Sequence, residues 1–396
     1  MKKIMILGAS ILQLPAIVQA KKMGIEVVAV DMNPKAIGFK EADKNLVIST
    51  IDIEAVLKAA QEEKIDGIMT LASDMPMRTV AVVAKEMGLV GIDEETALKA
   101  TNKAIMRQCL LEHNVPIPKF FKVSNEAEYK SAIKQFKTSF IVKPADNSGS
   151  RGIFLIERLD DEKTIEQAYR YSKGFSRNGD VVVEEYMDGE EVSVETLSVD
   201  GVCHVIQVTD KLTTGAPHFV EMGHSQPTKN SAGVAEKIRE VAKMAVNAIG
   251  IKNGPSHTEI MVTKEGPKIV ELGARLGGDC ITTHLVPLST GINMVENCIL
   301  IALGYPPNLT AKFEKGSAIR YIPSYKGVLK EVSNVDEGKQ VPGVQEISFV
   351  KEVGETLTDI ESSTSRIGFV VAQSDTADMA INACYKALDK MKIVIE

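Results

Sequence analysis

The sequence lacks the features that mark several large classes of protein. Its five cysteines are scattered and include no C-x-x-C pair, which argues against a zinc site or a disulfide framework and favours buried free thiols in a reducing cytosol. No apolar run approaches the ~18 residues needed to span a bilayer, and the short apolar stretch after the first two lysines reads as a strand rather than a signal peptide. The net charge of -7 argues against a nucleic-acid-binding surface. We therefore expect a cytoplasmic protein with no membrane and no nucleic-acid partner.

A glycine-rich dinucleotide fingerprint is also missing. The motif G-x-G-x-x-G does not follow the first expected strand, because the loop at 8–10 contains a single glycine. Asp31 ends the second expected strand and could hold a ribose, so a nicotinamide-dependent oxidoreductase stays open as an alternative. We favour a Rossmann-like domain that lends its loop to a substrate site.

The remaining composition and patterning indicate an ordinary globular chain in several parts. The 396 residues are 44% hydrophobic and 25% charged, which suits two to four domains at roughly 100–200 residues each. Continuous apolar strands alternate with helices over 1–100 and predict an α/β domain with a parallel, doubly wound sheet. The two prolines in NVPIPK at 114–119 mark a break. We expect a central part at 101–306, with a small mobile lobe at about 116–188, and a β-rich cap at 307–396.

Turn and periodicity signals predict individual elements. Asp200-Gly201 lies between two alternating segments and predicts a β-hairpin. Apolar residues at helical spacing predict a core helix over 234–249. The stretch LVIST at 46–50 is predicted to be a strand of the first sheet.

The segment FIVKPADNSGSRG at 140–152 has the chemistry of a phosphate cradle. Lys143 stands at the end of an expected strand and supplies a point charge, and the glycines that follow let backbone N–H groups approach a phosphate. The segment is not a Walker A loop, because its lysine precedes the glycines. A flexible surface loop is the alternative.

The segment VVVEEYMDGEE at 181–191 ends a strand with consecutive acids, an aromatic residue and a glycine turn. One interpretation is a solvated hairpin edge. The other is a hinge whose backbone forms hydrogen bonds with the edge of an adenine ring, while one acidic side chain binds the ribose hydroxyls.

Two strands that end in carboxylates suggest a metal site. SHTEIMV at 256–262 and PKIVELG at 267–273 are expected to pair across the turn KEG. Residues two apart share a face of a strand, so His257 and Glu259 lie together, and Glu259 can face Glu271 across the hairpin. Two close carboxylates repel each other unless a cation lies between them, and oxygen ligands favour Mg²⁺. The alternative is that each glutamate pairs with a lysine at a solvated edge.

In this order, the three segments resemble the ATP-grasp superfamily, and the resemblance covers nearly the whole chain. It implies an α/β protein with a Rossmann-like N-terminal domain, a two-lobed ATP-grasp domain of the α+β class, and a β-rich C-terminal cap. It assigns Glu259 and Glu271 to Mg²⁺, for which Mn²⁺ can substitute, and Arg275 to the transferred phosphoryl group or a substrate carboxylate. The residues that it assigns to ATP are Lys103, Lys143, Ser148, Gly149, Ser150, Gly152, Glu184, Glu185, Tyr186, Met187 and Glu191.

The sequence departs from the common pattern at one position after Glu271. The usual form has an asparagine two residues further on as an additional metal ligand, and this chain has Gly273. The expected metal site is therefore one protein oxygen short of the usual set, and we expect water to fill that position.

The resemblance also implies a reaction. The segments APHFVEMGHSQP at 216–227 and ELGARLGGD at 271–279 look most like ligases that join amino acids, and His218, Glu221, His224 and His257 are candidates for the substrate pocket. Such an enzyme is an ATP-dependent carboxylate–amine ligase that forms an acyl phosphate and releases ADP and phosphate, as a monomer or a homodimer. The alternatives are a purine-biosynthesis ligase of the phosphoribosylglycinamide synthetase type and a nucleotide-binding protein that has lost catalysis.

Overall fold

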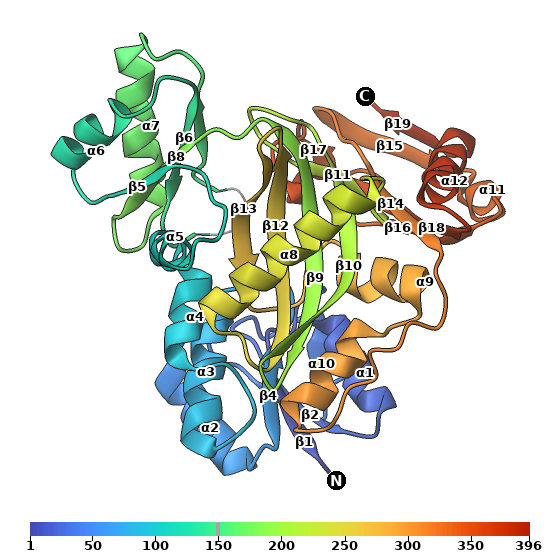
Figure 1. Cartoon of the computed structure of the whole chain (residues 1–396). Coiled ribbons are helices and arrows are strands. Elements are labelled where there is room, and N and C mark those ends of the chain that lie inside the picture. Colours follow the sequence, from blue (N-terminus) through green and yellow to red (C-terminus); the bar gives the residue numbers. More distant parts are fainter. Residues whose placement is uncertain (148–150) are drawn as a thin grey trace.

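The computed structural model describes residues 1–147 and 151–396 and begins with a parallel sheet (Figure 1). Its strand order is β3-β2-β1-β4, and all neighbours run in parallel. The strands are β1 (Lys3–Leu7), β2 (Glu26–Val30), β3 (Lys44–Leu46) and β4 (Gly67–Thr70), and the connecting helices are α1 (Leu14–Lys22), α2 (Ile53–Glu63) and α3 (Pro76–Met87). The predicted strand at 46–50 is wrong: the strand ends at Leu46, and Val47 is 58% exposed.

Alternate residues of β1 enter two different cores, which explains its continuous apolar run. Met5 and Leu7 pack with residues of α2 and α3, whereas Ile4 and Ile6 pack with residues of α1 and of the later helix α10 (Met294–Ala302). The loops that follow the carboxyl ends of β1 and β4 extend toward the rest of the chain. Asp31, which could have held a ribose, accepts hydrogen bonds from the backbone of Ala9 at 2.8 Å and of Asn33 at 2.9 Å, so it serves the β1 loop.

Two helices connect the first domain to a small lobe. They are α4 (Glu94–Thr101) and α5 (Lys103–Glu112). Asn102 lies between them and caps α5 by accepting hydrogen bonds from the N–H groups of Ala104 and Ile105, both at 3.1 Å. This cap fixes Lys103 in the first turn of α5.

The small lobe is an antiparallel sheet covered by two helices, and it stands apart from the large sheet in Figure 1. Its strand order is β5-β8-β6-β7. The elements are β5 (Phe120–Val123), α6 (Glu126–Ile133), β6 (Phe140–Pro144), β7 (Phe154–Ile156), α7 (Glu162–Phe175) and β8 (Val181–Glu185). The lobe has its own core, in which Tyr129 stacks on Tyr169 and Phe136 on Phe140 with ring centroids 4.8 and 5.4 Å apart.

The third and largest unit is a sheet of eight antiparallel strands with the order β13-β12-β9-β10-β11-β14-β18-β16. Its strands are β9 (Gly189–Val199), β10 (Val202–Thr213), β11 (Glu221–Gln226), β12 (Gly254–Thr263), β13 (Gly266–Gly273), β14 (Gly316–Ile322), β16 (Val344–Phe349) and β18 (Gly368–Ser374). The helix α8 (Ala232–Ile249) crosses one face of this sheet (Figure 1) and buries the apolar positions that predicted it. The sheet runs without interruption into the strands of the C-terminal part, and the domain boundaries at 100/101 and 306/307 stay a prediction.

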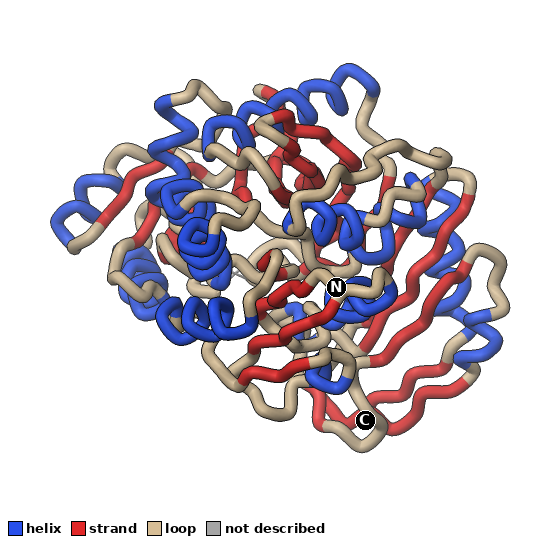
Figure 2. The backbone as a smooth tube through the Cα atoms, turned by 90° about the horizontal axis from the view of Figure 1, so that it is seen from below, coloured by secondary structure: helices blue, strands red, loops and turns tan. Residues whose placement is uncertain are grey.

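The remaining elements complete the C-terminal part and the segment after β13. They are α9 (Val286–Thr290), β15 (Gly327–Ser333), α11 (Val335–Lys339), β17 (Thr356–Leu357), α12 (Ala377–Lys390) and β19 (Lys392–Ile395), with short 3-10 or π turns at Ile37–Lys40, Ile281–Leu285 and Ser363–Ser365. Seen from below, helices flank the groups of strands on the outside (Figure 2). Among the described residues no single helix could cross a membrane, and only the pair Ile281–Thr290 and Met294–Ala302, bent by 112°, meets the criteria of length and composition when taken together.

Two predicted hairpins are present. The strands β9 and β10 meet at Asp200 and Gly201, whose φ angles of 49° and 82° are the left-handed pair that such a tight turn requires. The strands β12 and β13 pair across the turn KEG, and their register sets Glu259 directly opposite Glu271, next to a bulge. The strand β13 is an edge of the sheet, on the side of the small lobe (Figure 1).

Candidate active site

A cleft of about 670 Å³ lies where the small lobe, the edge of the large sheet and the loops of the first domain meet. Most of the side chains that the sequence predicted for the site line this cleft, and they come from α5, the small lobe and the large sheet with its flanking loops. They are Lys103, Lys143, Glu184, Glu185, Tyr186, Met187, Glu191, Glu221, His257, Glu259, Glu271 and Arg275.

Other predicted residues do not line the cleft. His218 is exposed in the connection between β10 and β11 and does not line the cleft, so its place in a substrate pocket stays a prediction. Gly152 is buried with a φ of 81°, and a Cβ atom there would lie 2.7 Å from Phe175 of α7, so it allows close packing within the small lobe. The predicted phosphate contacts Ser148, Gly149 and Ser150 lie outside the described residues.

The two predicted phosphate lysines are each held by a carboxylate. The Lys103 ammonium lies 2.7 Å from Oε1 of Glu271 and donates to the carbonyl of Asn147 at 2.6 Å. The Lys143 ammonium lies 2.6 Å from Oε2 of Glu184. Burial lowers the pKa of Lys143, and the Glu184 carboxylate opposes that effect. Both ammonium groups therefore enter the cleft with a fixed position.

Glu184 lines the cleft and holds two cations. Its carboxylate lies 2.6 Å from the Lys143 ammonium and accepts hydrogen bonds from Nε and Nη2 of Arg107 at 2.6 and 3.2 Å; its contact with ATP stays a prediction. Burial alone would raise the pKa of Glu184, but these two cations lower it to about 2. Sequence reasoning missed Arg107, because nothing in a helix such as α5 indicates which strand its arginine will meet.

The hinge between the small lobe and the large sheet follows Glu185. Oε2 of Glu185 accepts a hydrogen bond from the N–H of Lys119 at 3.2 Å, and the N–H of Tyr186 donates to the carbonyl of Ser139 at 3.1 Å. Apolar side chains from both units line the cleft beside this hinge, and they are Ile141, Ile153, Met187, Met261 and Val270. Such a slot suits a flat, apolar ring whose edge forms hydrogen bonds with backbone groups.

The paired glutamates are each in contact with cations. Oε1 of Glu259 lies 3.2 Å from the Lys211 ammonium and 3.4 Å from Nε2 of His257. Oε1 of Glu271 lies 2.7 Å from the Lys103 ammonium. Burial would raise the pKa of Glu259, but Lys211 and His257 keep it well below its usual range, so the carboxylate is ionised.

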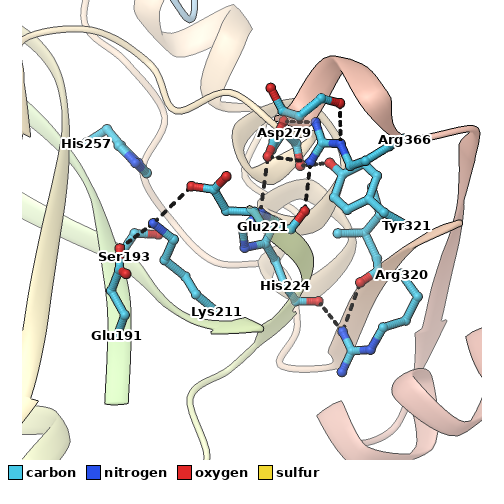
Figure 3. Close-up of polar contacts among 12 residues, drawn as sticks. Glu191, Ser193, Lys211, Glu221, His224, His257, Asp279, Arg320, Tyr321 and Arg366 are labelled. Carbon is cyan, nitrogen blue, oxygen red and sulfur yellow. Dashed lines mark hydrogen bonds and ion pairs between the residues drawn. The ribbon is translucent and has the colours of Figure 1, made fainter. Parts of the chain in front are cut away.

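Lys211 is a central residue that the sequence analysis missed. Its side chain is only 3% exposed, and its ammonium lies 2.5 and 3.6 Å from the carboxylates of Glu191 and Glu221, respectively (Figure 3). The same ammonium lies 3.2 Å from the carboxylate of Glu259. Burial would lower the pKa of Lys211, but these carboxylates raise it well above its usual value. The only signal in the sequence was a lysine near the end of a strand, and such a lysine is usually exposed to solvent.

His257 joins two carboxylates in the wall of the cleft. Its Nδ1 lies 2.7 Å from Oε1 of Glu195 on the neighbouring strand β9, and its Nε2 faces Glu259. Burial would lower the pKa of His257, but Glu195 and Glu259 raise it to about 9. The imidazolium therefore orients Glu259 from behind.

A second polar cluster forms the wall contributed by the C-terminal part (Figure 3). Nη1 and Nη2 of Arg366 donate hydrogen bonds to the carboxylate of Asp279 at 2.9 and 2.8 Å. The guanidinium of Arg366 also lies over the ring of Tyr321, whose hydroxyl donates to the backbone carbonyl of Asp279 at 3.1 Å. The cation overcomes burial and lowers the pKa of Asp279. The buried His224 lies with Nε2 3.6 Å from Oδ2 of Asp279, so it belongs to this wall.

Arg275 meets a residue of the first domain. Its Nε donates to Oδ1 of Asp74 at 2.8 Å, and its Nη2 donates to Oδ2 at 3.3 Å. Asp74 lies in the loop after β4 and was missed, because it is separated from Arg275 by about two hundred residues of chain.

Comparison with known proteins agrees with this geometry. Residues 136–283 match the model of the ATP-grasp domain, and residues 320–396 match that of the L-amino acid ligase C-terminal domain 2. The chain therefore contains an ATP-grasp domain, followed by an L-amino acid ligase C-terminal domain. Several of the proteins that it resembles are ligases by name.

Three relatives illustrate the range of this similarity. The L-arginine-specific L-amino acid ligase of Bacillus subtilis is 28% identical over 283 residues, which are 70% of this chain and 68% of that protein. The phosphoribosylamine–glycine ligase of Caldanaerobacter subterraneus is 25% identical over 378 residues, 90% of this chain and 89% of that one. The crystal structure of the L-amino acid ligase from Bacillus licheniformis superposes with a TM-score of 0.86 at 21% identity and covers 100% of this chain and 99% of its own.

Proposed function

We propose that the chain joins the carboxyl group of one amino acid to the amino group of a second amino acid, or of a similar small amine, through an acyl phosphate. The observation that carries this proposal is the pair Glu259 and Glu271, which faces Lys103 and shares a cleft with Lys143 and Arg275. The match of the C-terminal part to an L-amino acid ligase domain supports amino acids as substrates.

The residues fit a divalent cation. Glu259 and Glu271 present carboxylate oxygens from a rigid hairpin, and Mg²⁺ commonly binds one or two carboxylates together with substrate phosphates. The contacts of both glutamates to lysine and histidine use Oε1, so each has a second oxygen to offer. Mg²⁺ or Mn²⁺ held there would neutralise phosphate charge.

The first step moves a phosphoryl group onto the acid. An oxygen of the substrate carboxylate attacks the γ-phosphorus of ATP, the bond from that phosphorus to the β,γ-bridging oxygen breaks, and ADP leaves with the electron pair. Two anions must approach each other in this step, so positive charge has to be in place beforehand. Lys103, Lys143 and Arg275 supply it, since their partners already hold them at the edge of the cleft.

The second step forms the amide. The amine nitrogen attacks the acyl carbon, phosphate leaves, and the proton of the amine passes to solvent or to the departing phosphate. The subsite beside Glu221 and Glu259 suits an amine that arrives protonated, because the two carboxylates share a single cation, Lys211, and keep an excess of negative charge; the amine then loses a proton before its nitrogen attacks. Closure of the small lobe over this cleft would keep water from the acyl phosphate.

The test is a screen of amino-acid pairs with Mg²⁺ and ATP, in which ADP, phosphate and the coupled product are measured. We expect ADP and phosphate in equal amounts and only when both substrates are present, together with a product whose mass equals the two substrates minus water. AMP and pyrophosphate as products would refute the acyl-phosphate route. Each substrate added alone serves as the control.

The similarity to the phosphoribosylamine–glycine ligase, which extends over 90% of this chain, favours a second candidate within the same chemistry. The same assay with phosphoribosylamine and glycine tests it directly. Turnover with that pair, and with no pair of amino acids, would replace the first proposal.

A further inference from the structure

The loop after β4 reaches across the first domain to the reacting part of the cleft. Asp74 and Arg275 form a two-point ion pair, with Nε and Nη2 of the arginine 2.8 and 3.3 Å from the two carboxylate oxygens. The side chains of Asp74 and Arg275 are only 13% and 16% exposed. A planar guanidinium that is held at two N–H groups has one orientation, so its remaining N–H groups point in a fixed direction.

The loop that carries Asp74 is itself docked on the strand end that carries Arg275. The N–H of Ala72 donates to the carbonyl of Leu276 at 3.3 Å, and Ala72 adopts a φ of 57°, which is unusual for a residue with a side chain. A Cβ atom on Gly278 would lie 3.5 Å from the Cβ of Ala72, in ordinary contact. Strained backbone of this kind persists where the surrounding structure requires it, and it is common at functional sites.

Gly273 leaves the space that Asp74 occupies. A Cβ atom at this position would lie 2.6 Å from Oδ1 of Asp74 and 3.2 Å from Nε of Arg275. The backbone of Gly273 lies outside the left-handed region, so its conformation does not require glycine. A side chain at residue 273, such as that of asparagine, would therefore collide with the ion pair.

We propose that Asp74 is a positioning residue of the ligase site, which holds the guanidinium of Arg275 toward the reacting groups and away from the carboxylates of Glu259 and Glu271, and that residue 273 is glycine to make room for it. The role of Arg275 in this inference rests on the proposed function. The first domain thereby takes part in the chemistry through one side chain.

The arginine has competing partners, which is why it needs to be held. Burial lowers the pKa of Arg275, Asp74 raises it most strongly, and Glu259 and Glu271 raise it further, so all three carboxylates attract the guanidinium. If Asp74 is removed, the arginine is free to turn to the hairpin carboxylates. There it would compete with a divalent cation for the same oxygens.

The test is a double-mutant cycle of Asp74→Ala and Gly273→Ala, read on the binding of Mn²⁺ in the presence of a non-hydrolysable ATP analogue by electron paramagnetic resonance. We expect Asp74→Ala to raise the Mn²⁺ dissociation constant about tenfold, the size of one charge-assisted contact. Gly273→Ala should give a similar increase in the wild-type background and less than about a twofold change once Asp74 is alanine, because the clash is then gone. ADP formation should lose about tenfold or more in kcat, with KM for ATP within about twofold.

Asp66→Ala is the matched control. Asp66 is a carboxylate of the same domain that is also bound to a lysine and a backbone N–H, both at 2.8 Å, but lies away from the cleft. It should leave both readouts unchanged. Equal effects of Gly273→Ala in both backgrounds, or an unchanged Mn²⁺ affinity in Asp74→Ala, would overturn the positioning role. If the wild-type protein binds Mn²⁺ with the analogue but forms no ADP, the proposed function is overturned. The double-mutant cycle on Mn²⁺ binding can still be measured in that case, and it still tests the positioning role of Asp74.

Discussion

Replacing Glu184 by glutamine should destabilise the small lobe in a pH-dependent way. Glu184, Lys143 and Arg107 form a buried cluster in which one carboxylate serves two cations, and their side chains are 5%, 6% and 1% exposed. Glu184→Gln keeps the shape of the side chain and removes its charge. Two buried cations then lose their anion, which costs about 3–5 kcal/mol when a buried pair is broken from one side.

The pKa of Glu184 provides a second measure of this effect. A carboxyl group whose pKa falls from 4.5 to about 2 on folding stabilises the folded state by about 3 kcal/mol at pH 7. Because the folded-state pKa is the lower one, this stability is fully present above pH 4.5 and is lost as the pH falls toward 2. We therefore expect the difference between wild type and Glu184→Gln to be about 3 kcal/mol at pH 7 and about 2 kcal/mol at pH 3.5.

The assay is guanidinium unfolding of both proteins at several pH values, combined with hydrogen exchange of the amides of β6 and β8 at pH 7. Glu185→Gln is the neighbouring control, since that carboxylate is 37% exposed, contacts Lys268 only at 4.0 Å and should contribute less than about 1 kcal/mol. A difference below about 1 kcal/mol for Glu184→Gln at pH 7, or one that grows as the pH falls, would refute the reasoning.

Three further predictions concern the cleft. Lys143→Met should weaken the binding of ATP, measured by calorimetry, at least about tenfold, because charge-assisted contacts contribute about 1.5–3 kcal/mol. The control Lys173→Met, on the outer face of α7, should leave the affinity for ATP within about twofold of wild type. Equal affinities of the two variants for ATP would contradict the phosphate contact of Lys143. Glu271→Gln should abolish Mg²⁺-dependent turnover without changing the melting temperature by more than a few degrees, and a wild-type dependence on Mg²⁺ concentration would exclude Glu271 as a metal ligand. Lys211→Met leaves three carboxylates facing one another and should lower turnover at least about tenfold, while Lys243→Met on the exposed face of α8 should not; retained turnover in Lys211→Met would show that its three contacts are dispensable.

Local signals predicted the elements whose cause is local. The Asp200-Gly201 hairpin follows from two residues that tolerate a left-handed backbone, and the pairing of Glu259 with Glu271 follows from strand alternation across a short turn. The strand β11 was missed because its sequence EMGHSQ is polar and contains a glycine, and it is a strand only because β10 and β14 pair with it on both sides. The extent of the large sheet into the C-terminal part was missed for the same reason.

The partners of the predicted site residues were beyond sequence reasoning. Asp74, Arg107 and Lys211 each meet a site residue that lies far away in the chain, and a single sequence contains no information on which distant side chains meet. The residue types predicted which side chains could bind a metal or a phosphate, such as the acids and lysines at strand ends. They did not predict which oppositely charged side chains would pair with them. Gly273 shows the consequence, since the sequence alone suggested a missing ligand whose place water would fill, whereas the structure shows a space already filled by Asp74.

The pairing of charges in the cleft has a consequence for how ATP and a metal would enter it. Lys103 holds Glu271, so neither group is unpaired before binding. A phosphate that approached alone would draw Lys103 away and leave Glu271 uncompensated in a partly buried site, and a metal that approached alone would take Glu271 and leave Lys103 uncompensated. When both enter together, Lys103 turns to the phosphate as the metal takes the carboxylate, and every charge keeps a partner. The cleft therefore favours the metal–nucleotide complex over either component, and Glu271→Gln, which leaves Lys103 free for phosphate, should bind ATP without metal at least as well as the wild type does.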